Sequence, residues 1–169
     1  MAPFDVVEAT IPQLREALQR GRVTSEELVH RYLERIAAHD RAGASLNAVV
    51  VMNTRAVEEA RASDARRASR QLLGPLDGIP YTAKDSYQAR GLTVAAGSPA
   101  FEDLVAQRDS FTVERLRENG AVLIGLTNMP PMANGGMQRG VYGRAESPYN
   151  GAYLTSAFAS GSSNGSGTA

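Results

Sequence analysis

The chain has 169 residues, with 18 acidic and 18 basic side chains and no cysteine. A formal net charge of zero argues against a nucleic-acid partner, and the lack of cysteine excludes disulfides, thiolate metal ligands and a thiol nucleophile. The N-terminal residues lack the features of a secretory signal, and the longest apolar run, near residues 48–52, is far too short to span a membrane. We therefore expect a cytoplasmic protein without membrane contact, whose length suits a single domain with a substantial core.

The first fifty residues have a helical pattern. Thr10 and Pro12 predict the start of a short helix that ends at Gly21. Residues 24–27 (Thr-Ser-Glu-Glu) match a capping box, which predicts a second helix with one apolar face. His30 and His39 fall in or after this helix and are expected to be structural or surface residues. Neither has an acidic or serine neighbour at a catalytic spacing.

Strands and helices then alternate. Residues 46–52 predict a buried strand, and Asn53 is expected to cap a long polar helix that reaches about Gln71. The alternating arginine and acidic residues of that helix are typical of a solvated face.

The sequence pattern changes from helical to strand-like after residues 74–75 (Gly-Pro). Residues 79–83 predict a strand that ends at Lys84, and Asp109 or Ser110 is expected to cap a helix that stops at residues 119–120. Residues 121–126 form a continuous apolar run, which predicts a second interior strand. This order predicts an α/β fold with a largely parallel sheet.

Lys84 is the only lysine of the chain, because the other 17 basic residues are arginine. Arginine stays protonated at any working pH, whereas burial can lower the pKa of a lysine until it acts as a base. A GC-rich genome would explain the arginines but not the position of the exception. We therefore treat Lys84 as a candidate general base.

Glycine and small residues dominate from Asn134 onward. This composition is also typical of a flexible linker, an alternative that the sequence leaves open. The residues that lead into the tract favour packed backbone; they are Tyr142, Tyr149, Tyr153, Leu154 and Phe158. Phosphate-binding loops are excluded, because no lysine follows Gly165 and no clear strand leads into the loop.

A base-capable lysine and a glycine-rich loop with paired serines suit acyl transfer without histidine. A serine hydroxyl is a poor nucleophile until another group accepts its proton, and a neutral lysine can do so directly or through a second hydroxyl. Glycines let backbone N–H groups come close to the reacting centre.

Four segments together resemble the amidase signature family, whose members are serine hydrolases with a Ser–cis-Ser–Lys triad. They are residues 73–85, 91–98, 113–130 and 161–166. The resemblance implies a mixed, largely parallel central sheet covered by helices and preceded by N-terminal helices. It also implies hydrolysis of a small-molecule carboxamide through an acyl-enzyme, with no metal and no organic cofactor.

The resemblance assigns roles to individual residues. Lys84 would be the general base and Ser162 the bridging serine, held cis at a cost of about 3–4 kcal/mol. Ser163 would be a supporting hydrogen-bond donor, and Asp77 and Asp85 would hold loops. The remaining supporting positions of the site and substrate loop are Gly161, Asn164 and Met132.

The resemblance also implies that the nucleophilic serine and the oxyanion hole lie beyond residue 169. We expect residues 1–169 to be the N-terminal part of a single domain, with the C-terminal remainder as a partner and a homodimer left open. Pro131 replaces an acidic residue of the family, and Ala157, Ala159 and Ser160 stand where Arg, Pro and Gly are common. These departures leave the substrate open. Two alternatives remain: a protein like the A subunit of an amidotransferase, which delivers ammonia to a partner, and a non-catalytic relative.

Overall fold

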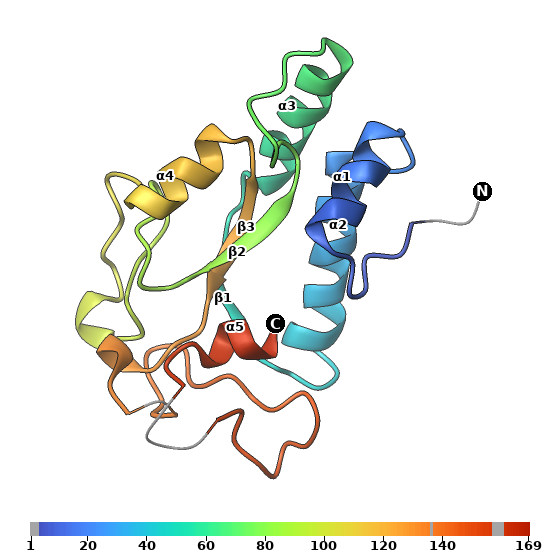
Figure 1. Cartoon of the computed structure of the whole chain (residues 1–169). Coiled ribbons are helices and arrows are strands. Elements are labelled where there is room, and N and C mark those ends of the chain that lie inside the picture. Colours follow the sequence, from blue (N-terminus) through green and yellow to red (C-terminus); the bar gives the residue numbers. More distant parts are fainter. Residues whose placement is uncertain (1–3, 136, 157–160) are drawn as a thin grey trace.

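The computed structural model describes residues 4–135, 137–156 and 161–169. Its sheet has three strands in the order β1-β3-β2 (Figure 1). Strand β1 (Val49–Met52) pairs antiparallel with β3 (Val122–Thr127), and β2 (Pro80–Lys84) pairs parallel with β3. The predicted α/β fold with a mixed sheet is confirmed.

Helices precede and flank this sheet, as expected. The α-helices are α1 (Ile11–Gln19), α2 (Ser25–Arg35), α3 (Ala56–Ala68), α4 (Phe111–Glu118) and α5 (Asn164–Thr168). The described residues also form the π-helix η1 (Ile36–Arg41) and the 3₁₀ turns η2 (Pro99–Phe101) and η3 (Pro131–Ala133).

Capping explains where the first two helices begin. Thr10 caps α1 and Thr24 caps α2, each in a capping box with the residue three positions later. The expected Asn53 cap is wrong, because α3 begins after Arg55. The Asn53 side chain instead accepts from the Arg55 amide and donates to the Leu123 carbonyl at 2.8 Å. It therefore ties the start of α3 to β3.

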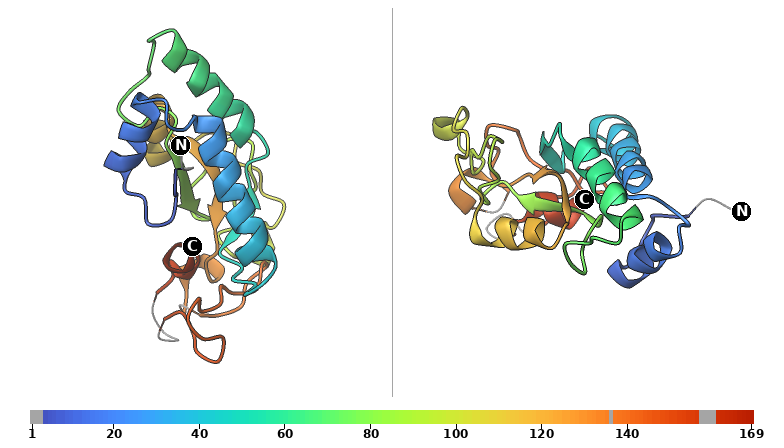
Figure 2. Two further views of the ribbon diagram at one scale, coloured as in Figure 1. Left: turned by 90° about the vertical axis from the view of Figure 1, so that its right-hand side faces the viewer. Right: turned by 90° about the horizontal axis from the view of Figure 1, so that it is seen from above.

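Helices cover both faces of β3. On one face, Val122 packs with residues of α2 and α3 such as Val29 and Ala60. On the other face, Leu123 packs against Val113 of α4. Figures 1 and 2 show α4 on one side of the sheet and α1 and α2 on the other.

The two predicted interior strands differ in their surroundings. All six residues of β3 are buried, as expected for an interior strand. Strand β2 pairs only with β3 within the described residues, and its side chains are half-buried or exposed. It is therefore an edge strand of this three-stranded sheet.

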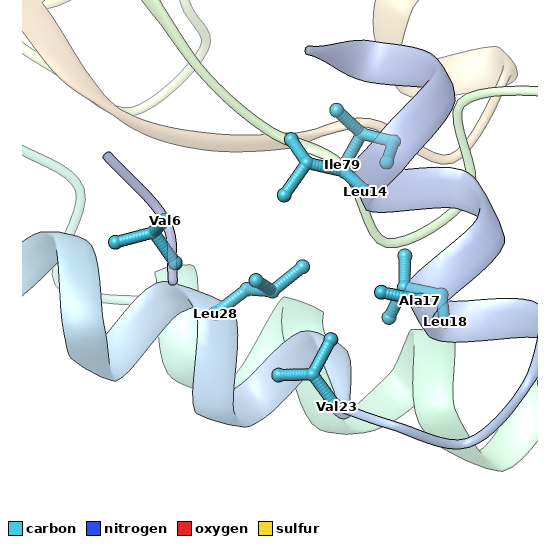
Figure 3. Close-up of a cluster of buried hydrophobic side chains, with 7 residues drawn as sticks. All are labelled: Val6, Leu14, Ala17, Leu18, Val23, Leu28 and Ile79. Carbon is cyan, nitrogen blue, oxygen red and sulfur yellow. The ribbon is translucent and has the colours of Figure 1, made fainter. Parts of the chain in front are cut away.

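A third hydrophobic cluster joins the N-terminal helices to the sheet (Figure 3). It brings Leu14 and Leu18 of α1 and Leu28 of α2 against Ile79, which directly precedes β2. Leu28 is fully buried. The cluster thus fixes α1 and α2 beside the strand that leads to Lys84.

An apolar hollow of about 780 Å³ borders this cluster. Its walls include Leu14 of α1, Ile79 and Pro80 at the start of β2, Ile124 of β3 and Thr168 of α5. The same face of the sheet therefore carries both a packed core and an uncovered apolar surface. No helix in the described part of the chain is long and apolar enough to cross a membrane.

Replacement of Leu28 by alanine should lower the free energy of unfolding by about 2–5 kcal/mol, because it leaves a cavity in the cluster. Ile11→Ala is the matched control, since Ile11 is half exposed in the adjacent helix. We expect this control to cost less than about 1 kcal/mol. Equal losses in urea unfolding would show that the cluster does not hold α1 and α2 in place.

Candidate active site

Lys84 is the last residue of β2. Its ladder partner is Thr127 of β3, and the next residue, Asp85, donates its amide to the Thr127 carbonyl at 3.0 Å. Successive side chains of a strand point to opposite faces, and Tyr81 and Ala83 face the α4 side. Lys84 therefore projects to the opposite face.

The side chains of Lys84 and Ser162 are in direct contact. Lys84 Nζ lies 2.8 Å from Ser162 Oγ, although the two residues are 78 positions apart in the sequence. Partial burial lowers the pKa of the Lys84 ammonium, because the charged form loses hydration. The contact and the burial together give a lysine that can exchange a proton with a serine hydroxyl.

The expected cis conformation of Ser162 is not found. No peptide bond among the described residues is cis. Gly161 and Ser163 are exposed and Ser162 is only half-buried. The loop therefore has few packing contacts to compensate the cost of a cis bond.

Helix α5 follows Ser162 and packs against the end of β3. A Cβ atom on Gly165 would lie 2.3 Å from the Asn128 amide nitrogen, so only glycine allows this approach. The Gly165 amide also donates to the Asn128 carbonyl at 3.1 Å. For residues 161–169, the flexible-linker alternative is thus excluded in favour of packed backbone.

Tyr149 and Tyr153 do not support that packing, whereas Tyr142 and Leu154 are half-buried. Tyr149 is 97% exposed and Tyr153 is 69% exposed, so the reason given for packed backbone is wrong for both. The glycines, through close backbone approach, provide the packing instead. Phe158, Ala157, Ala159 and Ser160 lie outside the described residues.

Asp85 lies on the face opposite Lys84 and holds a loop, as expected. Its carboxylate is fully buried, and Oδ2 accepts from the Gly97 amide at 2.9 Å. Gly97 in turn packs on the backbone of Met129 and Pro130. Burial raises the pKa of Asp85 to about 6, while the amides of Gly97 and Ala95 oppose the shift.

Asp77 also holds a loop. Its buried carboxylate accepts from the Arg66 guanidinium at 2.8 Å and from the Leu73 amide at 2.8 Å. Its pKa is lowered despite the opposing effect of burial, because Arg66, Ser63 and the Leu73 amide favour the charged form. Asp77 thus fixes the turn that leads into β2.

The other predicted positions are more dispersed. Asn164 is buried at the start of α5 and donates to Met137 Sδ, whereas the exposed Ser163 precedes α5 without capping it. Met132 is 60% exposed in the turn after β3, so it is not part of a buried arrangement. Both histidines are exposed, as expected.

Sequence analysis missed the hydroxyl group of Thr127. This side chain is fully buried at the end of β3 and contacts both Ala83 and Ser166. A polar Thr-Asn pair directly after a buried apolar run was the available signal. In the described residues, no group of three or more acidic or histidine side chains is arranged to hold a metal ion.

A protein-family model described as Amidase matches residues 27–169. This chain belongs to the amidase family. Curated relatives include the A subunit of the glutamyl-tRNA(Gln) amidotransferase of Synechococcus sp. (strain CC9605), which is 37% identical over 98% of this chain and 33% of its own length. The corresponding protein of Azoarcus sp. (strain BH72) is 37% identical over 97% of this chain and 32% of its own length.

Solved structures of the amidase family show the same fold. The peptide amidase of Stenotrophomonas maltophilia superposes with a TM-score of 0.88 at 35% identity, over 98% of this chain and 34% of that chain. An amidase family protein of Bacillus anthracis str. Ames gives a TM-score of 0.85 at 34% identity, over 95% of this chain and 32% of that chain. The chain thus spans about a third of the length of the amidase-family proteins it matches.

Asp85 should make the stability of this amidase-family chain depend on pH. Its folded-state pKa of about 6 lies above its ordinary value of 3.8, so the folded state holds the proton more tightly. The resulting stabilisation is complete below about pH 4 and is lost as the pH rises through 6. Asp85→Asn cannot titrate. Between pH 4 and 7.5, we expect its free energy of unfolding to rise by on the order of 2 kcal/mol relative to that of the parent.

The measurement is urea unfolding of both proteins at pH 4, 6 and 7.5. Asp77→Asn is the matched control, because the pKa of Asp77 is shifted in the opposite direction. Its stability relative to the parent should not improve over this range. A stability difference between parent and Asp85→Asn that is independent of pH would contradict the buried-carboxyl account.

Proposed function

We propose that the protein is an amide hydrolase that cleaves a carboxamide C–N bond through a serine acyl-enzyme. The observation that carries this proposal is the 2.8 Å contact between Lys84 Nζ and Ser162 Oγ. The lowered pKa of Lys84 and the membership of the amidase family support it. We also propose, from the family, a soluble cytoplasmic enzyme that needs no metal or organic cofactor.

Lys84 acts in this mechanism as the general base and Ser162 as the bridging serine. Neutral Lys84 accepts the hydroxyl proton of Ser162, which accepts the proton of the nucleophilic serine as that oxygen attacks the amide carbonyl. The proton returns through the same groups to the departing amine or ammonia, which leaves an acyl-enzyme. Water then hydrolyses the ester by the reverse proton path.

The nucleophile and the oxyanion hole are proposed to lie downstream of residue 169. Residues 1–169 would then be the N-terminal part of one domain, and the apolar hollow beside Ile79 and Ile124 is a suitable surface for the remainder. Relatives three times as long support this arrangement. Adding the downstream polypeptide to the 169-residue chain should restore hydrolysis, whether or not the assembled enzyme is a homodimer.

A second candidate is an amidotransferase component that passes ammonia to a partner enzyme. The relatives named as the A subunit of glutamyl-tRNA(Gln) amidotransferase favour it, whereas the superposition on peptide amidase favours a free-standing hydrolase. An assay of ammonia release from glutamine and from peptide amides separates the two. A non-catalytic relative would release ammonia from neither.

Replacement of Lys84 should abolish turnover in the complete enzyme. We expect Lys84→Ala to lower kcat by a factor of about 10³ or more, and Lys84→Arg to be nearly as damaging because arginine cannot supply a neutral base. Arg70→Lys is the matched control, because it makes the reverse substitution at an exposed position and should leave kcat unchanged. Near-native hydrolysis by Lys84→Arg would show that Lys84 is not the general base.

Ser162→Ala should lower kcat by a factor on the order of 10³ or more, since loss of one member of a catalytic unit forfeits most of its effect. Ser166→Ala, four residues later in α5, should cost much less, about tenfold. Steady-state rates on the same amide, with circular dichroism to verify folding, give the comparison. Equal losses for both variants would indicate a merely structural loop.

A further inference from the structure

The buried hydroxyl group of Thr127 makes two contacts. Its Oγ1 lies 3.3 Å from the Ala83 carbonyl oxygen and 2.7 Å from Ser166 Oγ. A carbonyl oxygen can only accept, and a hydroxyl has one proton to donate. Thr127 therefore donates to Ala83, and Ser166 donates to Thr127.

This two-bond chain connects the two segments that carry the candidate catalytic pair. The Ala83 carbonyl belongs to the peptide unit that joins Ala83 to Lys84, at the end of β2. Ser166 lies in α5, which begins two residues after Ser162. Thr127 thus links the backbone beside the base to the helix that follows the bridging serine.

Such a link would fix the end of β2 and helix α5 relative to each other. The lysine side chain has a flexible four-carbon stem, so the contact between Nζ and Ser162 Oγ cannot by itself fix the two segments relative to each other. Thr127 is fully buried on a strand whose residues are all buried, and it therefore provides a rigid reference point. Misplacement of a catalytic group by about 1 Å can cost a large factor in rate.

We propose that Thr127 is a positioning residue for the Lys84–Ser162 pair, acting through its hydrogen bonds to Ser166 and to the Ala83 carbonyl. The expected effect of Thr127 on kcat rests on the proposed hydrolase function, whereas its effect on the placement of Lys84 and Ser162 does not. The contacts of the Thr127 hydroxyl are with the Ala83 carbonyl and Ser166, so it acts on Lys84 and Ser162 through other groups. It sets the distance across which Lys84 and Ser162 exchange a proton.

The test compares Thr127→Val, which keeps the shape but removes the hydroxyl, with Thr127→Ser, which keeps the hydroxyl. In the complete enzyme we expect Thr127→Val to lower kcat about tenfold with KM within twofold, and Thr127→Ser to retain near-native kcat. The double variant Thr127→Val/Ser166→Ala should lose no more than either single change, because both break the same chain.

Ser25→Ala is the matched control. Ser25 is fully buried, and its hydroxyl donates to the Gly78 carbonyl at 2.9 Å, before the start of β2 rather than at its end. We expect Ser25→Ala to lower thermal stability without changing kcat. If Ser25→Ala and Thr127→Val lower kcat equally, or if Thr127→Ser fails to restore it, the positioning role is refuted.

A second readout does not need activity. With ¹³Cε-lysine incorporated into residues 1–169 and the downstream polypeptide added unlabelled, Lys84 gives the only lysine signal, because it is the only lysine of these residues. We expect Thr127→Val to move that signal at constant pH, and Thr127→Ser and Ser25→Ala to leave it in place. An unmoved signal in folded Thr127→Val overturns the proposal, whereas a moved signal in a protein that hydrolyses no amide would refute only the proposed function.

Discussion

The burial of β3 on both faces is the constraint from which the site follows. Its six residues are all buried between α2 and α3 on one side and α4 on the other. The strand cannot shift without opening both clusters, so Thr127 and Asn128 at its carboxyl end are fixed as well. Thr127 holds β2, and Asn128 holds α5 through Gly165. The positions of Lys84 and Ser162 depend on these contacts, because Lys84 ends β2 and Ser162 lies two residues before α5.

The side chains of Lys84 and Asp85, at the end of β2, make different kinds of contact. Lys84 points to the side of Ser162, where partial burial favours its neutral form. Asp85 points to the other side, where its carboxylate holds the Gly97 loop. The arginines stay charged and form ion pairs, such as Arg66 with Asp77. A single strand end thus separates the Lys84–Ser162 contact from loop anchoring, and the only lysine of the chain stands on the side of that contact.

Local signals in the sequence predicted much of this arrangement. Thr10 and Pro12 indicated the first helix, a capping box indicated the second, an apolar run indicated β3, and the single lysine pointed to the residue that contacts Ser162. Tertiary partners decided the rest: the Leu123 carbonyl binds the Asn53 side chain in preference to a helix-capping role. The exposure of Tyr149 and the contact of Thr127 with Ser166 depend on segments far apart in the sequence, which periodicity and composition do not place together. The expectation of a cis bond before Ser162 came from the family resemblance. No such bond is found in the described part of the chain, and residues 161–163, which are exposed or half-buried, have little packing that could impose one.

The protonation of Lys84 tests the central claim most directly. The 169-residue chain, labelled with ¹³Cε-lysine and combined with the unlabelled downstream polypeptide, gives one lysine signal whose pH titration measures the Lys84 pKa. The account predicts a pKa clearly below the ordinary value of about 10.4, and a change in the signal when Ser162 is replaced by alanine. A lysine that titrates at the ordinary value and does not respond to Ser162→Ala would contradict the assignment of Lys84 as a general base in contact with a bridging serine.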